Sequence, residues 1–161
     1  MSNPYRRARR EKRRKPYRPR EVRTPMIVGA DLVLRPLEQI VDRLGIDGTV
    51  DVDGKGTPVF QAGDGQWYDA AGAIEGVVWH FEMMETRHGL QLPLDGLREL
   101  VIAFRYCVPI QGSTMVKLRA ALPVLRQAMA GGDPADQVDI LQQTRIKAEL
   151  EAASPTQGAQ P

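Results

Sequence analysis

Residues 69–89 read DAAGAIEGVVWHFEMMETRHG, and this stretch predicts the central helix of the fold. Asp69 suits a helix N-cap, and Gly89 is a typical C-terminal stop. One face of this helix collects Ala70, Ile74, Val77, Val78, Phe81 and His88. Trp79 and Met83 lie on the opposite side, so the helix is either buried on both faces or exposed to a partner. Trp79 and Met83 are therefore our candidate protein-interface residues.

The helix expected before this stretch is shaped by a proline. Apolar residues recur with a helical period from Asp31 to Leu44. Pro36 weakens the first half of that pattern, because a proline is best tolerated near a helix start. We therefore expect the firm part of this helix from Pro36 to Leu44, with Gly45 ending it.

Three helices are predicted after residue 89. The first covers residues 94–106, with Leu97, Leu100, Val101 and Phe104 inward. The second is capped by Ser113, is kinked or split by Pro123, and ends at the glycine pair 131–132. The last begins at Asp133-Pro134, ends near Ala152, and carries on one face Val138, Leu141, Arg145 and Ala148.

Between the first two helices, residues 49–61 read TVDVDGKGTPVFQ. Valine alternates with aspartate and two glycines follow, which indicates a β-hairpin, and residues 66–68 form a possible third strand. The predicted fold is therefore a mainly helical α+β domain, in which a small antiparallel hairpin or sheet packs with about five helices. The predicted organisation is a disordered arginine-rich arm and linker (1–25), one globular domain (26–152) and a disordered tail (153–161).

Charge is distributed very unevenly along the chain. The first 23 residues hold 11 basic and 2 acidic side chains (11 − 2 = +9), whereas the other 138 hold 11 basic and 18 acidic ones (11 − 18 = −7). A cationic arm on an acidic body indicates a polyanionic partner. The guanidinium group of arginine suits phosphate, because it can form two parallel hydrogen bonds with it. The candidate nucleic-acid contacts are Arg6, Arg7, Arg9, Arg10, Lys12, Arg13, Arg14, Lys15, Tyr17, Arg18, Arg20 and Arg23.

No set of residues supports catalysis, a metal or a cofactor. His80 and His88 are eight residues apart and have no third ligand, so we expect core or boundary histidines. On a helical wheel, His88 lies in the middle of the apolar face and His80 on its flank. Cys107 is the single cysteine and lies in an apolar run, so we expect it to pack structurally in a reduced, cytoplasmic protein. No apolar stretch approaches the roughly 20 residues of a membrane helix.

These features predict a non-enzymatic, regulatory nucleic-acid-binding protein. The arm would grip phosphates, with RNA slightly favoured over DNA, while the acidic body would bind a protein partner or a second copy of itself. The alternative is a protein-interaction module, an inhibitor or adaptor of a host machine, whose arm only places it near nucleic acid. Deletion of residues 1–23 tests both predicted functions.

Two resemblances add to this interpretation. The segment 6–15 resembles the arginine-rich motifs of lambdoid phage antitermination proteins, in which a short helix grips an RNA hairpin. The body, through YRPREVRTPM (17–26), GTPVFQ (56–61), WYD (67–69) and RIKAELEA (145–152), is similar to small uncharacterised proteins of proteobacterial prophages. The resemblance implies a phage protein acting in the bacterial host cytoplasm, and it implies no particular mechanism.

Overall fold

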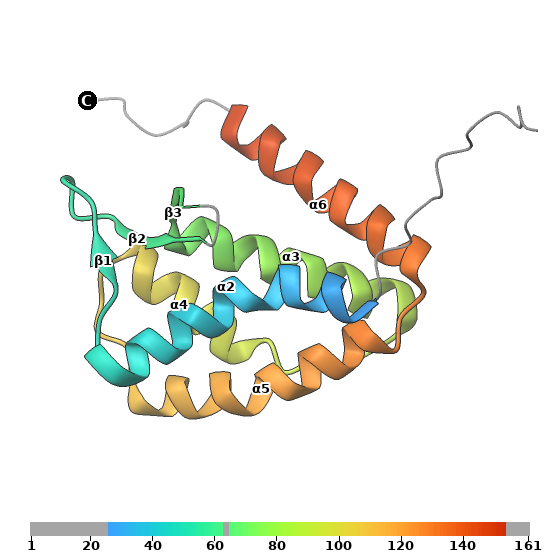
Figure 1. Ribbon diagram of the computed structural model, residues 1–161, viewed down its shortest axis with the longest axis horizontal. Coiled ribbons are helices and arrows are strands. Elements are labelled where there is room, and N and C mark those ends of the chain that lie inside the picture. The colour runs from blue at the N-terminus through green and yellow to red at the C-terminus, as the bar shows by residue number, and fades with distance from the viewer. Residues whose placement is uncertain (1–25, 63–64, 154–161) are drawn as a thin grey trace, which may run out of the picture.

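A computed structural model describes residues 26–62 and 65–153 (Figure 1). The helices are α2 (Met26–Asp47), α3 (Ala70–His88), α4 (Asp95–Arg105), α5 (Gly112–Ala130) and α6 (Pro134–Ala153). The strands β1 (Asp51–Val52), β2 (Pro58–Gln61) and β3 (Trp67–Asp69) form an antiparallel sheet in the order β1-β2-β3. The predicted fold class, mainly helical with a small antiparallel sheet, is confirmed. The predicted arm, linker and nearly all of the predicted tail lie outside the described residues.

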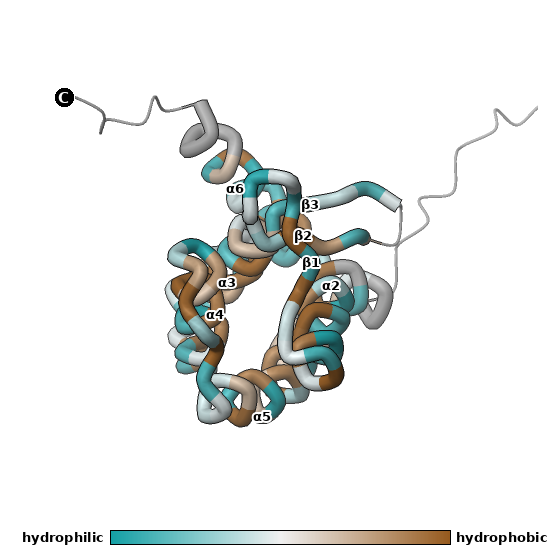
Figure 2. Tube along the Cα trace, turned by 90° about the vertical axis from the view of Figure 1, so that its left-hand side faces the viewer, coloured by the Kyte–Doolittle hydropathy of each residue, from teal (hydrophilic) through white to brown (hydrophobic). Residues whose placement is uncertain are grey.

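Four helices enclose the hydrophobic core. Figure 2 shows α2, α3, α4 and α5 around a common centre, with the sheet and α6 on one side of them. The largest side chains with almost no exposed surface are Phe81, Leu34, Leu37, Ile40, Ile74, Met84, Leu94, Leu97, Leu100, Leu118, Leu125 and Ile140. All but the last come from α2 to α5 or from Leu94 immediately before α4, so α6 contributes little to this core.

Helix α2 is longer than the sequence predicted. It runs through both Pro36 and Gly45 and ends at Asp47, after which Gly48 adopts a φ of +71° and donates its N–H to the Leu44 carbonyl at 3.0 Å. The prediction that the helix is firm only from Pro36, and that Gly45 ends it, is therefore wrong.

Packing on both sides of Pro36 explains this difference. Leu34 precedes the proline and Leu37 follows it, and both are almost completely buried. Arg126 of α5 also bridges the two halves, since one of its guanidinium nitrogens contacts Asp31 and the other contacts Glu38 at 2.6 Å. These two carboxylates raise the pKa of Arg126 above its ordinary value. Tertiary contacts thus outweigh the lost helical hydrogen bond.

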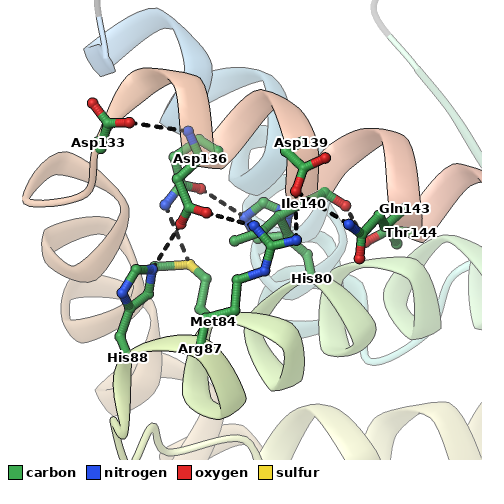
Figure 3. Close-up of polar contacts among 11 residues, drawn as sticks. His80, Met84, Arg87, His88, Asp133, Asp136, Asp139, Ile140, Gln143 and Thr144 are labelled. Atoms are coloured by element: carbon green, nitrogen blue, oxygen red, sulfur yellow. Dashed lines mark hydrogen bonds and ion pairs between the residues drawn. The ribbon is translucent and has the colours of Figure 1, made fainter.

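Of the two histidines of α3, His80 agrees with the predicted core or boundary position and His88 does not. His80 is buried, with 1% of its surface exposed, whereas His88 at the end of the helix is exposed. The helical-wheel prediction took account only of the face of α3 that packs against the main core. Helix α6 packs on another side of α3 and covers His80 there (Figure 3).

Three other predictions differ from the structure. The N-cap of α5 is Gln111, not Ser113, and Pro123 does not split the helix. Among the α6 side chains that the structure describes, those that are buried are Gln137 and Ile140, which lie outside the predicted stripe. Cys107, expected to pack structurally, is exposed and has a φ of +50° in the turn that follows α4.

The predicted N-cap of α3 is confirmed and allows a stability prediction. The Asp69 carboxylate accepts the Gly72 N–H at 2.8 Å. Replacing Asp69→Ala should lower the free energy of unfolding by about 1 kcal/mol, measured by urea denaturation, because that N–H loses its acceptor. Asp42→Ala, at an exposed position on α2, is the control and should change stability by less than about 0.5 kcal/mol. Equal effects of both substitutions would contradict a capping role.

Candidate functional site

The predicted nucleic-acid contacts, from Arg6 to Arg23, all lie outside the described residues. The structure instead shows how the charged side chains of the folded body contact one another. Among the described residues, at least six of its 11 basic side chains form ion pairs with carboxylates of the body. The pairs are Arg43 with Asp47 and Asp51, Arg87 with Asp136 and Asp139, Arg98 with Glu82 and Asp95, Arg105 with Glu75, Lys117 with Glu99, and Arg126 with Asp31 and Glu38.

Some of these pairs also shift the pKa of the groups involved. Lys117 and Thr114 both hydrogen-bond to Glu99, which lowers the pKa of its carboxyl and raises the pKa of Lys117. Such a lysine already has an anionic partner, so binding a phosphate would require it to give up that contact. With a net charge of −7, the chain beyond residue 23 is poorly suited to bind a polyanion.

A polar cluster fastens the start of α6 to the end of α3. Figure 3 shows Met84, Arg87 and His88 pointing from α3 toward α6. Arg87 contacts both Asp136 and Asp139, and His88 Nε2 lies 2.7 Å from the other Asp136 oxygen. Hydrogen bonds from Arg87 and then His88 lower the pKa of Asp136. This cluster positions α6, and its carboxylates are already occupied.

Beneath this cluster lies a buried chain of polar contacts. His80 Nε2 is 3.0 Å from Gln137 Oε1, and the Gln137 amide N–H donates to Met84 Sδ at 3.6 Å. Since Oε1 can only accept, His80 carries a hydrogen on Nε2, and burial favours the uncharged form of its ring. Nδ1 is then an acceptor, and among the described residues it is buried without a hydrogen-bond partner. Burial lowers the pKa of His80, and the bond to Gln137 opposes that shift only in part.

This buried histidine predicts a pH dependence of stability. The pKa of His80 is below 6.5 in the folded protein and near 6.5 in the unfolded chain. As the pH falls below about 6.5, the unfolded chain takes up a proton that the folded protein does not, so the free energy of unfolding decreases. The slope contributed by one proton is at most about 1.4 kcal/mol per pH unit.

Urea denaturation between about pH 7.5 and 5.5 measures this slope, because carboxylates titrate mostly at lower pH. His80→Phe should flatten the dependence, whereas His88→Asn, at an exposed position, should leave the His80 contribution in place. An unchanged slope in the His80 variant would contradict the assignment.

An apolar groove lies between α3 and α6, and we call it the α3–α6 groove. It has a volume of about 430 Å³. One side is the α3 face of Ala73, Gly76, Val77 and His80, and the facing side is Leu141, Thr144, Arg145 and Ala148 of α6. Residues of α2, β2 and β3 close the third side, including Val33, Phe60 and Tyr68. Three of the four residues in the predicted α6 stripe therefore line a groove.

The candidate interface residues lie next to α6. Trp79 is half-buried, and Lys147 Nζ of α6 lies 4.1 Å from the centre of its ring. Met83 is partly buried and packs against the core. Their use by a protein partner stays a prediction.

Comparison with protein-family models, with curated proteins and with solved structures gave no significant match. In residues 26–62 and 65–153, no three His, Cys, Asp or Glu side chains are grouped so that they could hold a metal ion. No helix in this described part is long and apolar enough to cross a membrane. The function is therefore inferred from the charges and contacts of the chain's own residues.

Proposed function

We propose that this is a non-enzymatic regulatory nucleic-acid-binding protein of phage origin, acting in the host cytoplasm. The arm from Arg6 to Arg23 binds phosphate groups, while the folded body contacts a protein partner. The observation that carries this proposal is the separation of charge, +9 in residues 1–23 against −7 in the rest of the chain.

The ion pairs of the body support the same division of labour. Because most of its cations contact carboxylates of the same body, phosphate binding should be confined to the arm. Tyr17 lies among the arginines, where its ring can stack on an unpaired base. Structured RNA is favoured over DNA, because arginine-rich segments commonly fold on RNA and because RNA loops present unstacked bases.

Exposed apolar side chains on the body favour an additional protein contact. Ile102 of α4, Val116 of α5, and Tyr106 and Val108 between these helices are each about half exposed or more. Large exposed apolar side chains are common at protein interfaces. The same observation supports the alternative function, in which the protein is an inhibitor or adaptor and the arm only localises it near nucleic acid.

One experiment separates the two functions. The full chain and a chain starting at residue 24 are compared for affinity to an RNA hairpin and to a DNA duplex of the same sequence, and for biological effect in the host. The regulatory proposal expects loss of both affinity and effect in the shorter chain. If affinity falls but the effect persists, the adaptor function is correct. If the full chain shows no salt-dependent binding to either nucleic acid, the proposed role of the arm is wrong.

A further inference from the structure

We infer that the α3–α6 groove binds a small, uncharged, largely apolar molecule that carries one hydrogen-bond donor. This inference is independent of nucleic-acid binding by the arm. The groove has the volume of ordinary ligand sites, which span about 300–1,000 Å³. Its walls are mainly aliphatic and aromatic, with few polar groups, as in most sites for small molecules.

The α3 side of the groove contains a glycine that packing does not require. Gly76 lies within α3, where glycine is less favourable than every residue except proline. A Cβ atom built on it would meet no atom within 4 Å, so no neighbour among the described residues needs the side chain to be absent. The absence of a side chain at Gly76 deepens the groove.

His80 gives the groove its chemical preference. The Gln137 bond holds a hydrogen on Nε2 and burial favours the uncharged ring, in which Nδ1 can only accept a hydrogen bond. A buried acceptor without a partner is rare in folded proteins and costs stability. A ligand O–H or N–H would satisfy Nδ1, whereas a carboxylate or an ether oxygen would not. The preferred ligand is therefore an apolar molecule with a single donor.

A donor reaches this nitrogen only when the groove opens slightly. Nδ1 has less than 1 Å² of exposed surface. The α6 side of the groove can move outward most easily. Beyond Ile140, the α6 side chains that the structure describes are exposed, apart from the partly buried Thr144. An outward shift of this half of the helix would leave the contacts of Arg87 with Asp136 and Asp139 in place.

Other occupants fit the groove less well. Residues 1–25 are strongly basic and lack an apolar stripe, and residues 154–161 read SPTQGAQP, with no large apolar side chain. A helix from a second copy or from another protein would fill apolar space, but most of its backbone N–H groups are already bonded, so it would reach His80 only with a side-chain donor or its first turn.

Two matched probes test the inference on the full chain. 1-Naphthol has an aromatic body and one O–H donor, and 1-methoxynaphthalene has the same rings without the donor. Calorimetric titration should show one molecule of 1-naphthol bound per chain, with affinity about fivefold to tenfold higher than that of 1-methoxynaphthalene. Nitrogen NMR should show a changed Nδ1 signal of His80 with 1-naphthol alone.

Variants assign the binding to the groove. Gly76→Leu should abolish binding of both probes by filling the groove from its α3 side, and Gln142→Leu, at an exposed position on α6 outside the groove, should leave binding unchanged. His80→Phe should remove the preference for 1-naphthol. If circular dichroism shows that Gly76→Leu is unfolded, Ala73→Leu replaces it as the blocking variant.

Several results would overturn the inference. They are no binding of either probe at about 1 mM, equal affinity for the two probes in the unaltered protein, and binding that persists in the blocking variant. Dimer formation that Gly76→Leu abolishes would also overturn it, because the occupant would then be a second copy. RNA binding by the blocking variant should be normal, so failure here is distinguishable from failure of the proposed function.

Discussion

Removal of residues 1–23 is expected to lower the affinity for an RNA hairpin about a thousandfold or more at low salt. The removed segment carries 11 basic side chains, and the remaining chain has a net charge of −7. A protein that contacts several phosphates releases their counterions on binding, so affinity falls steeply as the salt concentration rises. Fluorescence anisotropy over about 50–200 mM salt should give a steep slope for the full chain and no measurable binding for the shorter one.

The same salt titration also measures how much individual arginines of the arm contribute to binding. Arg9→Gln with Arg10→Gln should reduce the slope of log affinity against log salt by about two, since each phosphate contact contributes about one. The matched control is Arg35→Gln with Lys55→Gln, which removes the same charge from exposed positions on the body. That control should leave the slope unchanged. Equal effects of the two pairs would show that binding depends on overall charge and not on the arm.

Local signals explain why the outline of the fold was predictable. Asp69 and Gly89 mark the ends of α3, and Asp133 precedes α6, because capping depends on residues close in sequence. The hairpin followed from alternating valines and two glycines, and the third strand was identified beside it. Each of these features is decided within a few residues, so the sequence contains it directly.

Features that depend on distant residues were missed. Helix α2 continues through Pro36 because Arg126, far along the chain, contacts carboxylates on both sides of that proline. His80 is buried because α6 packs on α3 and presents Gln137 to it, 57 residues later in the chain. A helical wheel identifies an apolar face but not the partner of the other face. The position of Trp79 and Met83 away from the main face was the one sequence signal that α3 has a second packed side.

The second large effect is expected at the attachment of α6. Ile140 is the apolar residue of this helix that is completely buried, among those whose side chains the structure describes. Ile140→Ala should destabilise the docked helix by about 2–5 kcal/mol, because it removes buried methyl groups and leaves a cavity. Amide hydrogen exchange should show faster exchange throughout α6, while exchange in α2, α4 and α5 changes little, because no other large α6 side chain among those described lies in the central core.

Ile146→Ala is the matched control, since this isoleucine lies on the same helix with 56% of its surface exposed. It should change exchange in α6 only slightly. Arg87→Gln should have a smaller effect than Ile140→Ala, because ion pairs that stay partly exposed to solvent contribute little net stability. If Arg87→Gln releases α6 and Ile140→Ala does not, the polar cluster and not the buried isoleucine holds the helix. The α3–α6 groove requires α6 to be docked, so Ile140→Ala should also weaken binding of 1-naphthol, whereas Ile146→Ala should not.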